Sequence, residues 1–337
     1  MKRLSGLLLA ATLLLPITAS AEQPLPRDVP PGTSLVIADD ANYVASLLKL
    51  SGEQEKLAAD VTYANFSSGP LRLEAIRAGA AQVGAVGDVP PILAHYSDAG
   101  VVVVGAVVTA GPGNLVTTAP GSGIETLEDL KGKRVGINVG TAQQATVLRN
   151  LESVGLGIAD IEPVNLGLSE FADALRGGQI DAAVLKQPDR ARYLASVEGQ
   201  GARALDNAPG TATNLKYLYA AKTALDDPAQ AAAIADFVEA WYRAHAWRNG
   251  NRDTWIADYL VKDQRLSQDD AEQVWISEGD ATRAPGLEAI VPIQQKTIDL
   301  LQAGGAFPGK TLKAEDEFDF RFRDFGLEKA AAVQPAR

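Results

Sequence analysis

The feature that most restricts the fold of this chain is a repeated alternation of short, β-branched segments with helical stretches. β-Rich segments occur at 35–38, 61–66, 82–86, 101–108 and 115–118, and a second series occurs at 134–138, 161–166 and 180–185. Helical patterns lie between the strands of the second series, near 143–154 and 169–176. Strands that alternate with helices build α/β layers. The sequence therefore predicts an α/β fold with two lobes, one after the other along the chain.

The last third of the chain has the pattern of a helical region. From Pro228 onward apolar residues recur at helical spacing, and further helices are expected over 269–278 and 287–302. Gly304 is placed to end the last of them. Residues 329–337 are rich in alanine, and we expect a disordered tail there.

Two distant segments, 75–82 and 174–181, resemble each other. Each has the pattern of a helix closed by a glycine, Gly79 or Gly178, and followed by a strand. This similarity is expected if the two lobes have the same topology. A generic helix–strand unit has the same pattern, so the sequence leaves the equivalence of the lobes open.

The N-terminus has the pattern of an export signal. Two basic residues precede an apolar run, 4–15, which Pro16 breaks. The run is too short to span a bilayer. Because Ala19 and Ala21 are small, as a signal peptidase requires, we expect residues 1–21 to be a signal peptide cleaved after Ala21. A membrane anchor is the alternative.

The composition fits export and excludes several kinds of site. The chain has no cysteine, which removes disulfides, thiol nucleophiles, cysteine–metal sites and a lipid anchor at the cleavage point. A lipid-free protein with a cleaved signal peptide is expected in a Gram-negative periplasm. Without Lys2 and Arg3 the chain keeps 29 basic residues against 42 acidic ones, a formal charge of −13. This charge argues against nucleic acid as a partner, but it does not fix the potential inside a cleft.

Ligand sites of open α/β sheets lie beyond the carboxyl ends of the strands, where helices begin. Residues 67–70, Ser-Ser-Gly-Pro, follow a predicted strand and place hydroxyl groups beside the exposed backbone N–H groups of a helix start. This combination suits an anion. Residues 140–141, Gly-Thr, offer the same combination. An ordinary capped helix is the alternative at both places.

Several motifs follow one another in a characteristic order along the mature chain. They are Phe66-Ser67-Ser68-Gly69-Pro70, Val-Gly-Ala-Val-Gly-Asp-Val-Pro-Pro at 83–91, Asp-Leu-Lys-Gly-Lys-Arg-Val-Gly at 129–136, and Gly140-Thr141. Taken together, they resemble the aliphatic-sulfonate, taurine and nitrate group of ABC-transporter substrate-binding proteins. The resemblance covers nearly the whole mature chain.

The resemblance implies a type-II periplasmic-binding-protein fold, in which two α/β lobes are joined by two crossover strands and enclose a ligand between them. The crossings are expected near 110–114 and 213–217. Lobe one is then discontinuous, with residues 22–112 and 217–328. Lobe two consists of residues 113–216.

The resemblance also implies that loops of both lobes contact the ligand. The expected ligand-binding residues are Asn42, Ser67, Ser68, Gly69, Gly87, Asp88, Thr141, Ala142, Gln143 and Gln187. One loop departs from the family pattern, since Lys186-Gln187-Pro188-Asp189 keeps the proline of the frequent Trp-Asp-Pro loop but lacks its aromatic residue. This departure bears on the ligand more than on the fold.

Three acidic residues, Asp39, Asp40 and Asp88, are candidates for catalytic carboxylates or metal ligands. Asp88 directly precedes a helix start, and we interpret it as a capping residue. His95 and His245 are the only histidines of the sequence and do not form a ligand-spaced pair. No metal, cofactor or catalytic residue is expected.

Other polar and aromatic residues have plainer interpretations. Ser67 and Ser68 lack a Gly-x-Ser-x-Gly context and a histidine partner, which argues against a nucleophilic triad. Arg72 and Arg190 lie near the cleft loops; contact with an anion is one interpretation, and solvated helix residues that need no such role are the other. Four tryptophans at helical spacing are expected to pack between helices rather than stack on a ligand. They are Trp241, Trp247, Trp255 and Trp275.

The function expected from these observations is capture of a small molecule without chemistry. The protein would be the periplasmic solute-binding component of an ABC importer, a monomer that holds a small organic anion, sulfonate-like, through backbone N–H and hydroxyl groups. Hinge closure around the ligand would create the form that a permease in the inner membrane recognises. An enzyme on the same two-lobed fold and a binder of a neutral nitrogen compound are the alternatives.

Overall fold

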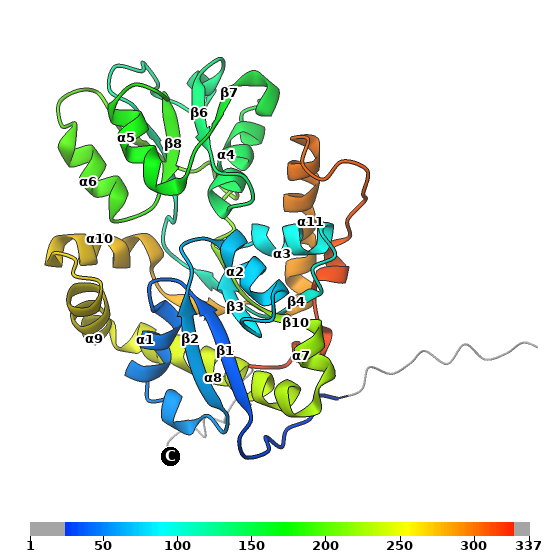
Figure 1. The fold of residues 1–337 in the computed structure, drawn as a ribbon. Helices are drawn as coiled ribbons and strands as arrows, with labels where there is room; N and C mark the ends of the chain where they lie inside the picture. Colours follow the sequence, from blue (N-terminus) through cyan, green and yellow to red (C-terminus); the bar gives the residue numbers. More distant parts are fainter. Residues whose placement is uncertain (1–23, 327–337) are drawn as a thin grey trace, which may run out of the picture.

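Two β-sheets, each covered by helices, make up the described part of the chain (Figure 1). The computed structural model describes residues 24–326. The expected signal peptide, 1–21, and the expected tail, 329–337, lie outside the described residues. The strands form two separate sheets, one of six strands and one of five, and helices pack on each. The expected α/β fold with two lobes is therefore confirmed.

The first sheet has the strand order β11-β4-β10-β3-β1-β2. Its strands are β1 (Ser34–Asp39), β2 (Asp60–Asn65), β3 (Val83–Val86), β4 (Val101–Thr109), β10 (Leu215–Ala221) and β11 (Ala281–Arg283). β1 pairs in parallel with β2 and β3, whereas β10 runs antiparallel between β3 and β4. Nearly every residue of β4 is buried, which explains its unbroken run of valine and other small residues.

The second sheet has the strand order β7-β6-β8-β5-β9. Its strands are β5 (Leu115–Thr118), β6 (Arg134–Ile137), β7 (Glu162–Asn165), β8 (Ala182–Leu185) and β9 (Ala204–Leu205). β6 lies in parallel between β7 and β8, and β5 runs antiparallel between β8 and β9.

The two sheets have the same design. In each, three parallel strands in the order second, first, third are followed by an antiparallel strand that enters from the other sheet, and then by the fourth strand of the lobe. The similarity between 75–82 and 174–181 falls at equivalent places, before β3 and before β8. Gly79 and Gly178 both have a positive φ, 74° and 65°, as expected after a helix. The lobes are therefore equivalent in topology.

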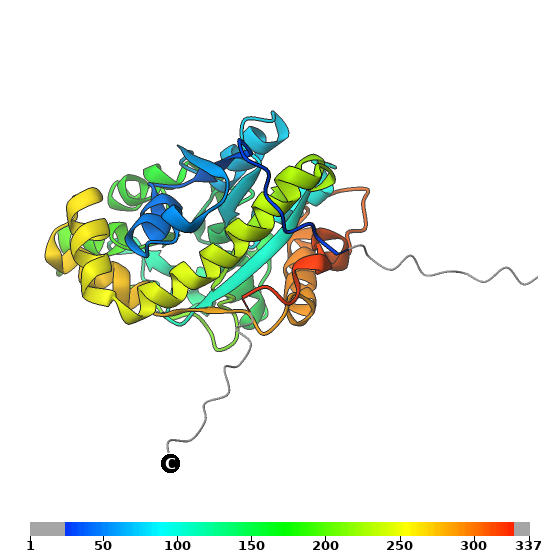
Figure 2. The same ribbon diagram turned by 90° about the horizontal axis from the view of Figure 1, so that it is seen from below.

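Helices cover both faces of the first sheet, as right-handed connections on either side of its first strand require. α1 (Tyr43–Leu50) and the long α8 (Pro228–Gly250) pack together on one face, and α2 (Gly69–Arg77) and α3 (Val89–Tyr96) pack on the other. α8 crosses the sheet obliquely (Figure 2). Asp227 begins α8 by accepting from the N–H groups of Ala229 and Gln230.

The second sheet is covered in the same way. α4 (Ala142–Ser153) contributes Val147, Leu148 and Leu151 to the core on one face, and α5 (Phe171–Arg176) and α6 (Asp189–Ser196) form a separate core on the other. Arg134 joins β6 to β8, because its backbone N–H and guanidinium both donate to Asp181.

Helix α11 (Leu287–Ala303) lies alongside both lobes (Figure 1). Ile290 belongs to the core of the first sheet, whereas Ile298 and Leu301 pack into the α4 core of the second. The segment after it continues this contact through Phe307 and Leu312. The C-terminal region therefore packs on both lobes, while the boundaries 22–112, 113–216 and 217–328 stay predictions.

The remaining helices are short or irregular. They are α7 (Lys222–Asp226), α9 (Arg252–Thr254), the π-helical segment η5 (Trp255–Asp263), α10 (Gln268–Glu278) and the 3₁₀ turns η1 (Gln54–Lys56), η2 (Glu128–Leu130), η3 (Ile158–Asp160), η4 (Leu168–Glu170), η6 (Ala314–Glu317) and η7 (Phe320–Phe322). None of the helices within 24–326 combines the length and the apolarity that crossing a membrane requires.

All eight strands expected from the sequence are present, with ends shifted by two residues at most. The expectation that strands largely stop after Pro228 misses β11, a three-residue edge strand with no apolar alternation. Two-residue β9 also gives no pattern in the sequence.

Candidate functional site

A cavity of about 440 Å³ is lined by residues from both lobes. Nine of the ten expected ligand-binding residues lie in its wall. They are Ser67, Ser68, Gly69, Gly87, Asp88, Thr141, Ala142, Gln143 and Gln187. Asn42 does not, because its backbone N–H donates to Asn65 Oδ1 (2.7 Å) and its side chain also bonds to that of Asn65. Ligand contact by these residues stays a prediction.

The first helix start in the wall belongs to α2. Ser68 has extended backbone geometry, and its hydroxyl oxygen accepts from the N–H of Leu71 (3.4 Å). Pro70 lies in the first turn, where its missing N–H costs no hydrogen bond. The remaining N–H groups of this turn have no partner in the helix and give the cavity wall a partial positive charge.

The second helix start belongs to α4, in the other lobe. Thr141 Oγ1 accepts from the N–H of Gln144 (3.4 Å) and donates to the carbonyl of Asn138 (2.7 Å). The side chain of Gln144 in turn accepts from the N–H of Gly140 (2.9 Å). Gln143 lies one residue into the helix and lines the cavity.

Two glycines allow the lobes to approach each other beside these helix starts. A Cβ added at Gly87 would lie 3.0 Å from the Cβ of Ala142, across the cavity wall. One added at Gly140, where φ is +81°, would lie 2.5 Å from Leu93 Cδ1. The close approach of α3 to the start of α4 therefore requires these glycines.

Asp88 does not cap the helix that it precedes. Its backbone is already helical, and its side chain forms no capping bond. Instead its carboxylate, in a residue only 2% exposed, accepts from Arg149 and from Thr213 Oγ1 (2.9 Å). Arg149 also donates to Thr297 Oγ1 (2.7 Å). The capping interpretation is wrong, because a buried carboxylate needs a cationic partner, and here that partner comes from α4 of the other lobe.

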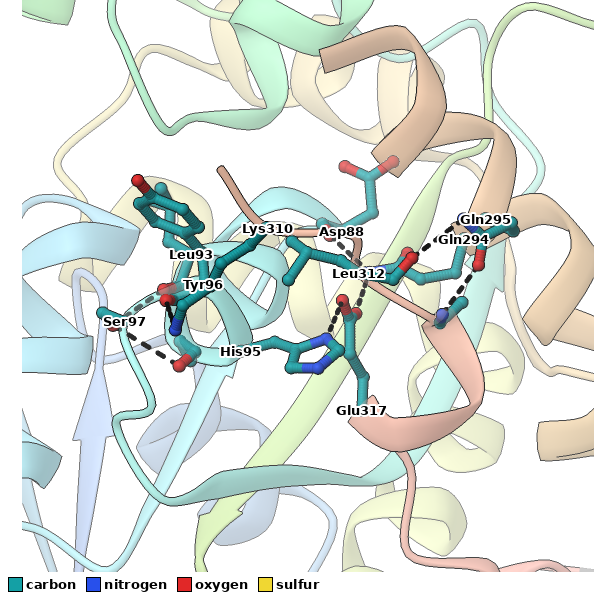
Figure 3. Close-up of polar contacts among 12 residues, drawn as sticks. Asp88, Leu93, His95, Tyr96, Ser97, Gln294, Gln295, Lys310, Leu312 and Glu317 are labelled. Carbon is teal, nitrogen blue, oxygen red and sulfur yellow. Dashed lines mark hydrogen bonds and ion pairs between the residues drawn. The ribbon is translucent and has the colours of Figure 1, made fainter. Parts of the chain in front are cut away.

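A chain of polar side chains holds the backbone of Asp88 in place (Figure 3). Gln294 Nε2 donates to the Asp88 carbonyl (2.9 Å) and to Glu317 Oε2 (2.7 Å), and His95 Nδ1 lies 3.3 Å from Glu317 Oε1. Burial raises the pKa of Glu317, although the hydrogen bonds with His95 and Gln294 oppose the shift. The loop before α3 is thus fixed from behind by α11 and the C-terminal segment.

The carboxylates of Asp39 and Asp40 have hydrogen-bond and ion-pair partners within the protein, which explains them without a catalytic or metal-binding role. Asp39 accepts from the N–H groups of Val44 and Ala45 (both 3.0 Å) in the first turn of α1. Burial raises the pKa of Asp39, and these backbone hydrogen bonds oppose the rise. Asp40 lies 3.5 Å from the guanidinium of Arg72. Within residues 24–326 no group of three or more histidine and carboxylate side chains is arranged to hold a metal.

The two arginines near the cleft are not solvated, contrary to one of the two sequence interpretations. Arg72 is 7% exposed and lines the cavity, where it donates to the carbonyl of Phe66 (2.8 Å). Arg190 is 6% exposed and donates to the carbonyl of Gly113 (3.0 Å). Burial lowers the pKa of Arg190. Both guanidinium groups donate to backbone carbonyls, and Arg72 also pairs with Asp40.

The loop 186–189, which departs from the family pattern, also contributes to the cavity wall. Lys186, Gln187 and Pro188 all line the cavity. Gln187 Oε1 accepts from the N–H of Ala191 (3.0 Å) at the start of α6. This leaves the side-chain NH₂ of Gln187 as its group for a ligand.

One further part of the wall, which we call the cavity floor, was not among the expected ligand-binding residues. It consists of Lys216, Glu278, Tyr43, Trp241 and His245. Lys216 Nζ donates to Glu278 Oε1 (3.0 Å) and lies 4.7 Å from the centre of the Tyr43 ring. Trp241, Trp255 and Trp275 are buried in the core, as expected, and Trp247 packs at its edge.

The wall is formally balanced in charge, and two guanidinium groups bond to it from behind. Its charged residues are Arg72, Arg149, Lys186 and Lys216 against Asp39, Asp40, Asp88 and Glu278. Two buried guanidinium groups bond to wall residues from behind, Arg190 to Gly113 and Arg248 to Glu278 (2.8 Å). These groups together carry two positive charges in excess, against a chain with net charge −11.

Comparison with known proteins assigns the chain to a family. The NMT1/THI5-like family matches residues 59–248, more than half of the chain. The chain belongs to this family. An Escherichia coli K12 protein named as an aliphatic sulfonates-binding protein is 27% identical over 250 residues, which are 74% of this chain and 76% of that protein.

Solved structures show the same fold. The periplasmic aliphatic sulphonate binding protein SsuA from Escherichia coli is 24% identical with a TM-score of 0.73, covering 88% of this chain and 99% of that one. The alkanesulfonate-binding protein SsuA from Xanthomonas axonopodis pv. citri, bound to MOPS, has the same identity and TM-score and covers 85% and 98%. Together with the strand order, these matches confirm the type-II periplasmic-binding-protein fold and the resemblance to sulfonate-binding proteins.

Proposed function

We propose that this protein is the periplasmic solute-binding component of an ABC importer and that it binds a small organic anion, sulfonate-like, in the cavity between its lobes. The family, and the relative named for aliphatic sulfonates, support the class of protein. The export signal expected at 1–21 supports the compartment. In this proposal the protein acts as a monomer, and a permease in the inner membrane recognises its closed form.

The observation that carries the proposal is the pair of helix starts in one cavity. Ser68 begins α2 in one lobe and Thr141 begins α4 in the other, and both line the same space. Unpaired backbone N–H groups and the helix dipole favour an anion at each start. An anion that contacts both would be held equally by both lobes.

The surroundings of the cavity support an organic anion over a small inorganic one. The two buried guanidinium groups behind the wall, Arg190 and Arg248, favour a negative ligand. A volume of about 440 Å³ falls in the range of about 300–1,000 Å³ typical of pockets for organic ligands. Such a space leaves room for a carbon skeleton beyond the charged group.

Binding in this cavity would couple the ligand to the arrangement of the lobes. A ligand that contacts both helix starts interacts more favourably with a closed arrangement than with an open one. It therefore shifts the population toward the closed arrangement. A permease that recognises the closed form would then respond only to loaded protein.

In this proposal the protein carries out no reaction on its ligand. Ser67 and Ser68 have no histidine partner, since His95 contacts Glu317 and His245 contacts the rings of Tyr43 and Trp241. Incubation of the ligand with excess protein, followed by mass spectrometry, tests this point. Intact ligand is expected, and a new product would establish the enzyme alternative.

A thermal-shift screen tests the class of ligand. Alkanesulfonates, nitrate, carboxylates and neutral nitrogen compounds are added to the protein, and a ligand that binds only the folded state raises Tm. We expect the largest rise with a sulfonate. If a neutral nitrogen compound alone raises Tm, the protein is a binder of that class and the anion proposal fails.

A further inference from the structure

We propose that the cavity floor binds a second oxyanion of the ligand, so that the preferred ligand is an organic sulfonate with an acidic group at its far end. This inference rests on the proposed function and names its substrate class more closely. It depends on the charges and the exposure of the floor residues.

Lys216 occupies an unusual place for a lysine. It is the second residue of β10, which lies inside the first sheet between β3 and β4, and both of its neighbours in sequence are buried. Its own side chain is 33% exposed and lines the cavity. The accessible part of the ammonium group therefore faces the ligand space rather than the outer surface.

The carboxylate beside Lys216 does not neutralise the floor. Glu278 accepts from Lys216 Nζ (3.0 Å) and from Arg248 (2.8 Å), so two cations share one carboxylate. Arg248 is fully buried behind the floor and donates its other bond to the carbonyl of Gly279. One positive charge is left in excess, and Lys216 is the cation that the cavity exposes.

The wall around Lys216 contains polar atoms that lack partners. Within the described residues, the hydroxyl of Tyr43, the indole N–H of Trp241 and both ring nitrogens of His245 are buried without a hydrogen bond. Burial, with Lys216 and Arg248 nearby, keeps the pKa of His245 well below its ordinary value, so the neutral ring offers one donor and one acceptor. These atoms are closed to solvent, so they carry no charge that offsets Lys216, which is left as the cation of the floor that a ligand can reach.

These groups select the chemistry of the ligand's far end. An ammonium group would meet the excess positive charge of the floor, which disfavours it. A carboxylate or a second sulfonate would accept from Lys216 in a charge-assisted hydrogen bond. A methyl end would give the ammonium no partner beyond Glu278.

The test compares sulfonates that differ only at the far end. Isothermal titration calorimetry of the full mature protein uses linear alkane-1-sulfonates, their ω-amino derivatives and α,ω-disulfonates, with chains of about two to six carbons. At the best length we expect the disulfonate to bind about tenfold more tightly than the alkanesulfonate, as one added charge-assisted bond provides. The ω-amino sulfonate should bind most weakly.

Lys216→Met identifies the group responsible. Glu278 keeps Arg248 as a partner in this variant, and the side chain keeps its length. Loss of a cavity cation weakens the binding of both ligands, but the tenfold advantage of the disulfonate over the alkanesulfonate should disappear. Lys216→Arg, which keeps the charge, should preserve the preference. Lys222→Met, at an exposed lysine just beyond β10 and outside the cavity wall, should change neither affinity.

The outcomes separate this inference from the proposed function. If alkanesulfonates bind but no chain length shows an advantage that depends on Lys216, the inference is overturned and the proposed function stands. If no sulfonate binds the wild-type protein, the proposed function fails first. Should Lys216→Met not fold, the wild-type ranking decides, and tightest binding of an ω-amino sulfonate overturns the inference.

Discussion

Ser68 combines two roles at one position, since its hydroxyl caps α2 and its side chain lines the cavity. Aspartate caps a helix about as well as serine does. Ser68→Asp should therefore preserve folding but place a negative charge where the proposal puts the anion. We expect sulfonate affinity, measured by titration calorimetry, to fall at least about tenfold, with Tm nearly unchanged.

Ser267→Asp is the matched control. Ser267 caps α10 by accepting from the N–H of Asp270 (3.1 Å) and does not line the cavity. This variant should bind the sulfonate as the wild type does. If Ser68→Asp also keeps full affinity, the loop 67–70 has only a structural role.

His245 makes stability depend on pH. Its folded-state pKa is held well below the ordinary value of 6.5 by burial, Lys216 and Arg248. Below pH 6.5 the unfolded chain takes up a proton that the folded protein does not. Stability should therefore fall as pH falls, by about 1.4 kcal/mol per pH unit from this residue.

His245→Phe removes this contribution. Denaturant unfolding between pH 7 and pH 5 should show a shallower decline for the variant than for the wild type. At pH 7 the variant should be at least as stable, because both ring nitrogens of His245 lack partners. Equal slopes in the two proteins would show that His245 titrates normally when folded.

Nine of the ten residues expected from the sequence line the cavity wall. They could be predicted because Ser, Thr and Gly after a parallel strand mark the start of a helix, where such sheets bind ligands. The sequence could not place Lys216. A single lysine between apolar residues of a strand has the pattern of a solvent-facing position, and only the return of β10 to the first sheet turns it toward the cavity. Arg149 was missed for a similar reason, since its partner Asp88 is distant in the chain.

At the scale of elements, the pair of Asp88 and Arg149 joins α4 to the loop before α3. Arg149→Met would leave the buried carboxylate of Asp88 with only the hydroxyl of Thr213. Removing one partner of a buried ion pair costs about 3–5 kcal/mol. We expect a loss of this size in the free energy of unfolding, measured with denaturant.

Asp88→Asn combined with Arg149→Met tests whether the loss comes from the uncompensated charge. The double variant should recover much of the stability that Arg149→Met loses, because asparagine can be buried without a cation. Strictly additive losses would mean that the two side chains contribute independently.

Strands were easier to predict than the elements that join the lobes. The buried strands of both sheets are continuous apolar runs bounded by turn residues, which is a local signal. Helix α11 has an equally clear helical pattern, but its pattern does not tell which surface it covers. Its packing on both lobes depends on where α4 and β4 lie, and no local sequence contains that information.

At the scale of the whole molecule, an ion pair spans the lobes at α6 and α10. Arg192 Nε donates to Asp270 Oδ2 (2.9 Å), and an exposed pair such as this contributes about 0–1 kcal/mol to stability. Arg192→Ala should change Tm little but make an open arrangement more accessible. We expect a severalfold faster dissociation of the sulfonate in stopped-flow experiments.

Arg203→Ala provides the comparison. Arg203 pairs with Glu125 (3.5 Å) inside the second lobe, so its loss cuts no contact between lobes. Its dissociation rate should match that of the wild type. Equal rates in all three proteins would show that the α6–α10 contact does not hold the closed form.

The most direct test of the central claim is a crystal structure of the protein with a bound alkanesulfonate. We predict sulfonate oxygens within about 3 Å of backbone N–H groups at both helix starts, after Ser68 and after Thr141. Density for the sulfonate at one lobe only, or outside the cavity, would contradict the claim that the two helix starts hold the anion together.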